Sequence, residues 1–460
     1  MTEDRDTTPD TGTTAEGPAR IPARLGRTIL ALAVPALGAL IAEPLFLMAD
    51  TAIVGHLGIN ELAGAGLGTT VLQTAVGLMV FLAYSTTPAV ARWLGARRLD
   101  LALAAGRDGI WLAVVLGLVL AVAGWFAGPA LLGALGAEGQ VLGFALDYLR
   151  WSMPGLPAML LVLAATGVLR GLQDTRTPLI VAGAGFGVNI VLNFSLVYGA
   201  GLSVAGSAIG TSIAQWGMAV VYLAMLVPRL RAEGVPLRPH PGGVVGTGKV
   251  GSWLMLRTLS LRAGILATVW VATSDGALTW AAHQLVFTIF TLMACALDAL
   301  AIAAQALIGK ELGAGDRATA SALTRLMTRW GLIFGVGTGV VLALVAPVLG
   351  AVFTSDPDVQ RAAAIGLWVL AASQPLAGLV FVLDGVLIGA GDARYLALAG
   401  VIALVLYLPL LAGAAWLPLL PDLPILWLWC AFGLGYMALR GATLLWRIRN
   451  DRWMALGAPA

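Results

Sequence analysis

Long apolar segments alternate with short polar ones along most of the chain. From Thr28 onward, each apolar segment exceeds 20 residues and ends at Gly, Pro or charged positions. A helix needs roughly 20 apolar residues to cross the hydrocarbon layer of a membrane. The pattern therefore predicts twelve membrane-spanning helices, at residues 28–54, 62–88, 104–132, 141–168, 177–198, 203–227, 250–273, 278–308, 320–349, 359–388, 394–416 and 423–446.

The chain also matches itself at an offset of 218 residues. The Gly, Asp and Arg spacing of residues 167–176 recurs in residues 385–394. Six helices return a chain to its starting side of the membrane, so the two copies should run parallel. We expect an all-α integral membrane protein divided into a leader at 1–24, a six-helix lobe at 25–228, a linker at 229–249, a second six-helix lobe at 250–447 and a tail at 448–460.

Composition and charge agree with a membrane protein. The chain is 59% hydrophobic and 11% charged, with too little polar surface to cover a water-soluble globule. With the N-terminus inside, 23 of the 27 Lys and Arg residues fall in the leader, the alternate connections and the tail. The positive-inside rule then places both termini in the cytoplasm, and we expect a bacterial inner membrane. The net charge of +3 belongs to these connections and gives no reason to expect nucleic acid.

Several kinds of chemistry find no support. Residues 1–20 have no apolar core or cleavage site, so we expect a disordered cytoplasmic leader and not a signal peptide. The sequence has no phosphate-binding loop and no paired metal-ligand spacing, and its two cysteines lie in predicted helices. We therefore expect neither an enzyme nor a cofactor. Polar groups inside the predicted helices remain, because each is costly in hydrocarbon and should face a cavity or a partner.

The first predicted helix carries two carboxylates. Asp50 lies in its outer half, and Glu43 lies two turns deeper on the same face. A partly buried carboxyl can exchange a proton, or hold Na⁺ with oxygen neighbours, so Asp50 is a candidate ion-coupling site. The alternative is an outer-edge carboxylate that caps the second helix or bonds a neighbouring residue. Glu43 has either a direct role or a structural hydrogen bond. Pro44 is either a hinge or an ordinary membrane-helix proline.

Amides and arginines add further candidates. Asn189 and Asn193 share one face of the fifth helix, and Thr211 lies in the sixth; they face the lobe interior or join helices to one another. In the second lobe, intramembrane arginines need carboxylate partners, which favours structural ion pairs over a second coupling site. The residues concerned are Arg257, Arg262, Asp298 and Asp384.

Three motifs carry a family resemblance. They are Asp50-Thr51-Ala52 before Gly55-His56-Leu57-Gly58, Gly309-Lys310-Glu311-Leu312-Gly313-Ala314, and Leu383-Asp384-Gly385. With them, the chain from Thr28 to Trp446 resembles the multidrug and toxic compound extrusion (MATE) family, and most closely its DinF-like branch. The resemblance implies two six-helix lobes, a central cavity, and export of small organic compounds, cationic or amphipathic, against inward H⁺ or Na⁺. It also implies a monomer in contact with membrane lipids.

The resemblance further implies a cation site in the first lobe, at Asp50, Tyr148, Asn189, Asn193 and Thr211. Asn193 is a departure, because some members have a carboxylate there; this favours one proton over Na⁺ without settling the choice. Other branches place acidic coupling residues in the second lobe, so Asp384 stays a candidate. The runner-up is a lipid-intermediate flippase of the same broader superfamily. Such a protein should line its cavity with cations, for which the sequence offers only Arg257 and Arg262.

Overall fold

The computed structural model describes residues 23–416 and 423–457, and within them every regular element is helical. Twelve helical stretches there are long and apolar enough to cross a membrane, which confirms the predicted class and number. Residues 1–22 of the predicted leader at 1–24 lie outside the described part, and α1 already begins at Ala23. The helices are α1 Ala23–Gly55, α2 Ile59–Leu78, α3 Phe81–Gly95, α4 Leu99–Ala134, α5 Gly139–Ser152, α6 Leu156–Gly171, α7 Arg176–Phe194, α8 Ser203–Ala232, α9 Pro241–Ser274, α10 Ala277–Gly313, α11 Arg317–Phe353, α12 Pro357–Gly389, α13 Ala393–Trp416, α14 Pro424–Trp429 and α15 Met437–Ile448.

The helix ends differ from the predicted ones. The second span is α2 and α3 together, and the fourth is α5 and α6 joined by the 3₁₀ turn Met153–Gly155. Much of the predicted linker at 229–249 is helical, because α8 continues to Ala232 and α9 already begins at Pro241. Hydropathy identifies only the apolar part of a helix, and the last turns of α8 carry Arg229 and Arg231. The connection itself is residues 233–240.

Side-chain caps define where three helices of the C-terminal half begin. Asp356 accepts from two backbone N–H groups at the start of α12, and the His240 ring accepts from Gly243 at the start of α9. At α11, Asp316 accepts hydrogen bonds from the Thr319 backbone N–H at 2.9 Å and from the Thr319 hydroxyl at 2.7 Å. These bonds hold the pKa of Asp316 below its usual range. Each cap satisfies N–H groups that have no partner inside the helix.

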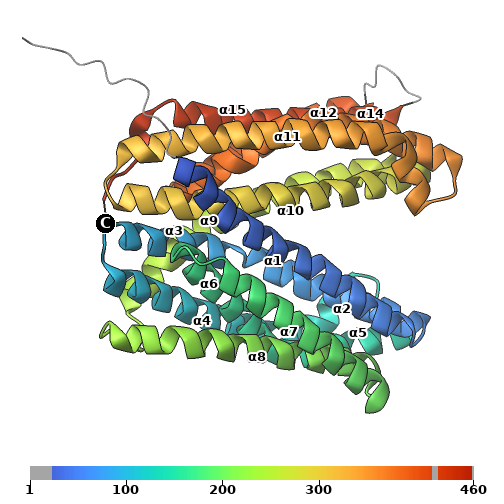
Figure 1. The fold of residues 1–460 in the computed structure, drawn as a ribbon. Helices are drawn as coiled ribbons and strands as arrows, with labels where there is room; N and C mark the ends of the chain where they lie inside the picture. The colour runs from blue at the N-terminus through green and yellow to red at the C-terminus, as the bar shows by residue number, and fades with distance from the viewer. Residues whose placement is uncertain (1–22, 417–422, 458–460) are drawn as a thin grey trace, which may run out of the picture.

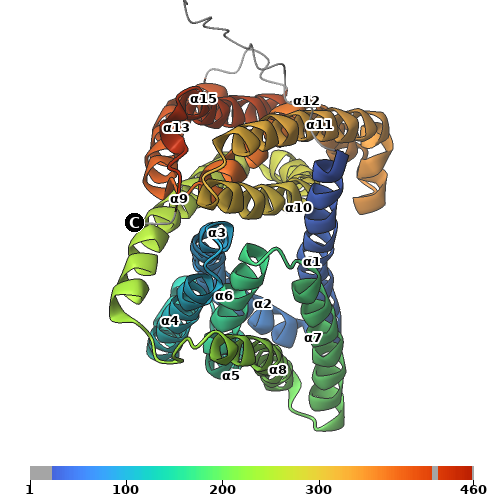
Figure 2. The same ribbon diagram turned by 60° about the vertical axis from the view of Figure 1, so that its left-hand side comes forward.

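The helices form two bundles, α1–α8 and α9–α15 (Figure 1). We call the side with the connections after α3, α6, α10 and α12 the basic end, because Arg97, Arg98, Arg176, Lys310 and Arg317 lie there. The bundles meet at this end, where the backbones of α3 and α10 touch: a Cβ on Gly95 would overlap the Lys310 carbonyl, and one on Gly313 would overlap the Arg92 carbonyl. Toward the other end the bundles diverge (Figures 1 and 2).

The chain after α15 reinforces this junction. From α3, Arg92 donates hydrogen bonds to the carbonyl oxygens of Ala390, Ala455 and Gly457. The Gly457 N–H donates to the Leu312 carbonyl of α10 at 2.9 Å. Trp453 is buried. Residues 451–457 therefore contact both bundles where they meet.

We expect Gly313→Ala to open the basic end. The added methyl group would overlap the α3 backbone, and such overpacking costs about 1–3 kcal/mol. The measurement is thiol labelling of a cysteine introduced at the buried Ala91, in a chain whose Cys295 and Cys430 are replaced by Ala. Labelling should be faster with Gly313→Ala. Gly133→Ala is the control, because its Cβ would meet nothing within 4 Å; equal labelling rates in the two variants would contradict the expectation.

Helix α1 contacts both bundles. Near its start, Ala36 packs with Ala299 and Ile302 of α10, while its later turns lie on α7 and α2 (Figure 1). Both Pro35 and Pro44 lie inside the helix. A helix that connects two bodies in this way is a suitable place for bending, so the hinge at Pro44 stays a prediction.

Candidate functional site

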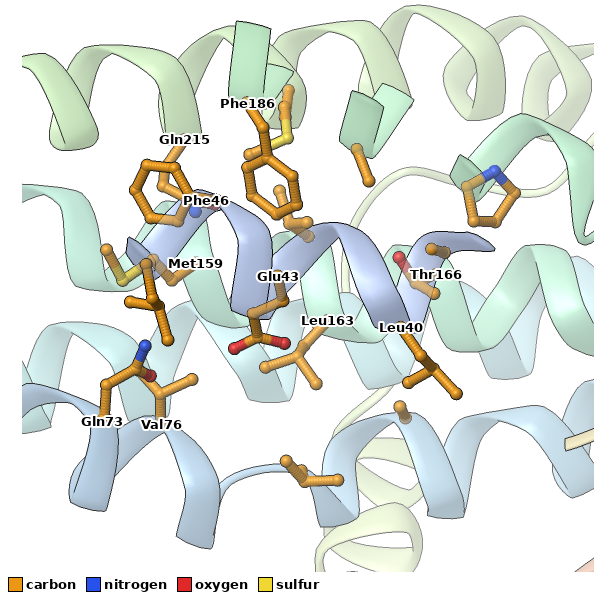
Figure 3. Close-up of a pocket in the computed structure, with 18 of the residues that line it drawn as sticks. Leu40, Glu43, Phe46, Gln73, Val76, Met159, Leu163, Thr166, Phe186 and Gln215 are labelled. Atoms are coloured by element: carbon orange, nitrogen blue, oxygen red, sulfur yellow. The ribbon is translucent and has the colours of Figure 1, made fainter. Parts of the chain in front are cut away.

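A cavity of about 370 Å³ lies inside the first bundle (Figure 3). Its wall comes from α1, α2, α3, α5, α6, α7 and α8, and Asp298 of α10 is the contribution of the second bundle. The rings of Phe46 and Phe186 stack in its wall with their centroids 5.0 Å apart, and the amides of Gln73 and Gln215 also line it. The wall is thus largely apolar, with a few polar groups, as is usual for small-molecule sites.

Glu43 projects into the middle of this cavity (Figure 3). Among the described residues no hydrogen bond or ion pair involves its carboxylate. The structure therefore gives no support to a structural hydrogen bond as the role of Glu43. A carboxylate that faces an apolar cavity without a partner is suited to attract a cationic group. The flat rings of Phe46 and Phe186 are suited to stack on a planar one.

Asp50 lies behind the cavity wall, with 6% of its surface exposed. Its Oδ1 accepts hydrogen bonds from Asn193 Nδ2 of α7 at 2.7 Å and from Ser207 Oγ of α8 at 2.6 Å. The approach of Asn193 requires a glycine on α8, because a Cβ on Gly210 would overlap the Asn193 amide. The carboxylate therefore joins three helices, α1, α7 and α8.

The other residues of the predicted cation site lie beside Asp50. Asn189 Nδ2 donates to Thr211 Oγ1 at 3.0 Å, and both residues are buried. The Tyr148 hydroxyl lies close enough to interact with Thr69 and, electrostatically, with Asp50. Both Tyr148 and Thr211 also line the cavity. The structure therefore brings the five predicted residues together beside the cavity, with Tyr148 and Thr211 in its wall, while their role in coupling stays a prediction.

This arrangement offers oxygen ligands around one carboxylate. The side-chain oxygens of Asn189 and Asn193 are buried, and no hydrogen bond to either exists within the described residues. Neutral oxygens beside a carboxylate suit a hard cation such as Na⁺, and the same carboxylate can hold a proton. The geometry is therefore compatible with both ions.

Sequence reasoning missed Ser207. It lies one turn before Thr211 on α8, so the i, i+4 spacing that paired Asn189 with Asn193 would also have placed Ser207 on the site's face. A serine in a membrane helix more often bonds its own backbone or a neighbouring helix. Only the contact with Asp50, 157 positions away in sequence, distinguishes it.

The second bundle contains a chain of charges. Arg257 of α9 makes two contacts with Asp384 of α12, one from Nε to Oδ1 at 3.1 Å and one from Nη2 to Oδ2. Arg440 of α15 lies 3.7 Å from the same carboxylate. Asp298 accepts from the Tyr84 hydroxyl of α3 at 3.4 Å, so this carboxylate contacts the first bundle. In this geometry Asp384 serves as an ion-pair partner.

Two arginines depart from expectation. The requirement for a carboxylate partner is wrong for Arg262: its side chain is exposed and reaches Gly77 of α2, and no ion pair with it occurs in the described part of the chain. The guanidinium reaches from α9 toward α2, so it lies between the two bundles, where a water-filled space can take the place of a carboxylate partner. Arg170 comes after the predicted helix at 141–168 and is counted with the basic residues of the connections, but it belongs to the last turn of α6 and lines the cavity. Charge counting cannot separate the last turn of a helix from the loop after it.

Comparisons with known proteins agree with this geometry. The MatE family model matches residues 35–195 and 258–412, more than half of the chain. The chain is 31% identical to the Arabidopsis thaliana protein DETOXIFICATION 44, chloroplastic, covering 94% of this chain and 84% of that protein. It is 29% identical to the Escherichia coli (strain K12) DNA damage-inducible protein F, covering 92% and 93%.

Solved structures show the same fold. A MOP superfamily transporter from Pyrococcus furiosus Vc1 (DSM3638) superposes with a TM-score of 0.84 at 21% identity, covering 93% of this chain and 96% of that one. The Vibrio cholerae MATE transporter VcmN in its bent form gives a TM-score of 0.83 at 20% identity, covering 94% and 98%. With the family match over both bundles, this twelve-span membrane protein belongs to the MATE family of multidrug and toxic compound transporters.

Proposed function

We propose that this protein is a secondary antiporter that exports small organic cations or amphipathic compounds and is driven by inward H⁺ or Na⁺. The observation that carries the proposal is the position of Asp50, hydrogen-bonded to α7 and α8 directly behind the cavity wall. Thr211 and Tyr148 belong both to that wall and to the surroundings of Asp50. Ion and substrate can therefore influence each other through shared side chains.

The coupling follows from differential binding. An ion on Asp50 changes the hydrogen bonds that hold α1 against α7 and α8, while a substrate in the cavity contacts α1, α7 and α8 from the other side. Each ligand favours the arrangement of the two lobes to which it binds better, and the influence is reciprocal. The lobes, α1–α8 and α9–α15, would alternate between opening at the basic end and at the opposite end. The structure has them in contact at the basic end.

The same proposal assigns a membrane and an orientation. Basic side chains gather at one end of the molecule, which supports a cytoplasmic location for this end and both termini. The match to the Escherichia coli relative supports a bacterial inner membrane. With the basic end closed, the cavity would open to the outside.

A flippase for lipid intermediates is the alternative, and the charges argue against it. Its cavity should be cationic, but Arg257 contacts Asp384, and neither Arg257 nor Arg262 lines the cavity. Two carboxylates, Glu43 and Asp298, lie in the cavity wall beside one arginine, Arg170. This wall favours a ligand that carries a positive charge.

Transport under separately imposed gradients tests the proposal. Purified protein in liposomes, loaded with a fluorescent organic cation, should move the dye when a proton gradient or a sodium gradient is applied across the bilayer. We expect at least one gradient to drive movement, and the active one identifies the ion. Liposomes without protein are the control. No movement under either gradient, with protein shown to be folded and inserted, would contradict an ion-coupled exporter.

A further inference from the structure

Arg170 is the basic side chain in the wall of the cavity. It lies in the last turn of α6, with Tyr84, Tyr222 and Asp298 as its electrostatic neighbours. Across residues 23–416 and 423–457, no hydrogen bond and no ion pair within 4 Å involves its guanidinium. None of its nitrogens is among the buried polar atoms that lack a partner, so the guanidinium stays open to the cavity.

The arginines in the neighbourhood of Arg170 outnumber the carboxylates. Asp298 accepts a hydrogen bond from the Tyr84 hydroxyl and interacts electrostatically with both Arg170 and Arg257. Asp384 is occupied by Arg257 and Arg440. This contiguous group thus contains three arginines and two carboxylates, and Arg170 is the arginine without an ion-pair contact. An unpaired arginine inside a membrane protein is costly and is best explained by a ligand that pairs with it.

We propose that Arg170 is the residue of the cavity that binds a carboxylate on the transported compound. A planar guanidinium offers paired N–H donors that match a carboxylate in geometry. The hydroxyls of Thr166 and Tyr222, 3.2 Å apart, also lie in the cavity wall and can donate to the same group. The cationic part of the molecule lies at Glu43, beside the stacked rings of Phe46 and Phe186. This inference rests on the proposed export function and specifies its substrate.

The test uses two dyes that differ in one group: a rhodamine with a free carboxylate, and its ethyl ester. Binding to purified protein in detergent is measured by fluorescence anisotropy. Wild type should bind both dyes. Arg170→Gln should weaken binding of the carboxylate dye by about tenfold or more, the usual worth of a hydrogen bond to a charged group. The ester should change by less than about twofold, and Arg170→Lys should retain part of the preference because it keeps the charge.

A second measurement needs no variant. Benzoate, which supplies only a carboxylate, should compete with the carboxylate dye on wild type and leave ester binding unchanged. The assignment of Arg170 would be overturned if Arg170→Gln lost affinity for both dyes equally. It would also be overturned if wild type bound only the ester, or if benzoate competed equally with both dyes. None of these results would contradict the proposed export function. If wild type binds neither dye, the cavity is not the substrate site and the proposed function itself fails.

Discussion

Asp50→Asn is expected to remove ion-driven export while leaving the fold in place. Asparagine has nearly the same shape, and its side-chain oxygen can still accept from Asn193 and Ser207, so α1 stays bonded to α7 and α8. The amide cannot bind or release a proton and brings no charge for Na⁺. Allosteric coupling is typically worth about 1–3 kcal/mol of binding free energy, or about 5- to 150-fold in affinity, so gradient-driven transport should fall at least about fivefold, to the rate measured without a gradient.

The measurement compares initial rates of dye movement in liposomes with and without the driving gradient. Asp147→Asn is the matched control, because Asp147 is an exposed carboxylate on α5 next to Tyr148. It should transport like wild type. A loss of the same size in Asp147→Asn would point to general damage, and full gradient-driven transport by Asp50→Asn would remove Asp50 from the coupling mechanism.

Asp384→Asn is expected to destabilise the second bundle by about 3–5 kcal/mol, the usual cost of removing one partner of a buried ion pair. Asp384 is the shared carboxylate of Arg257 and Arg440, so its neutralisation leaves both guanidiniums without an ion-pair contact. Arg257→Gln should cost less, because Asp384 keeps Arg440 at 3.7 Å. We therefore expect Asp384→Asn to destabilise the protein more than Arg257→Gln does.

Thermal unfolding of the purified protein in detergent measures the order. Asp358→Asn is the control, because Asp358 pairs with Arg361 in an exposed position and such pairs contribute only about 0–1 kcal/mol. We expect the midpoint to fall most for Asp384→Asn, less for Arg257→Gln and least for Asp358→Asn. A larger fall for Arg257→Gln than for Asp384→Asn would mean that Arg440 does not share the carboxylate.

The sequence was sufficient to predict the number of spanning helices, because each helix that crosses the hydrocarbon layer needs its own long apolar segment. It was insufficient for helix ends: α8 and α9 extend past their apolar parts with polar and glycine-rich turns. The break between α2 and α3 at Met79 and Val80 lies within an apolar run, so hydropathy contains no signal for it.

The candidate site was predictable where residues share one helix or match a family motif. Asn189 and Asn193 are one turn apart, Thr211 is a polar residue inside a predicted helix, and the family pattern supplied Tyr148. Contacts between distant helices were not predictable in this way. The hydrogen bond from Tyr84 to Asp298 joins residues 214 positions apart, and the cavity position of Arg170 depends on how α6 packs against α3, α7 and α8. Such contacts are set by three-dimensional packing, which no local pattern describes.

The hydrogen bonds of Arg92 have a consequence for hydration. Its three acceptors, the carbonyl oxygens of Ala390, Ala455 and Gly457, all belong to the second bundle, while Arg92 belongs to the first. The Gly457 N–H donates to the Leu312 carbonyl of α10, so residues 451–457 stay with the second bundle. Separation of the two bundles at the basic end must therefore break the hydrogen bonds of Arg92. A guanidinium that loses three acceptors in a buried place must gain water. Entry of water at Arg92 would therefore accompany the opening of this end, before any substrate could pass.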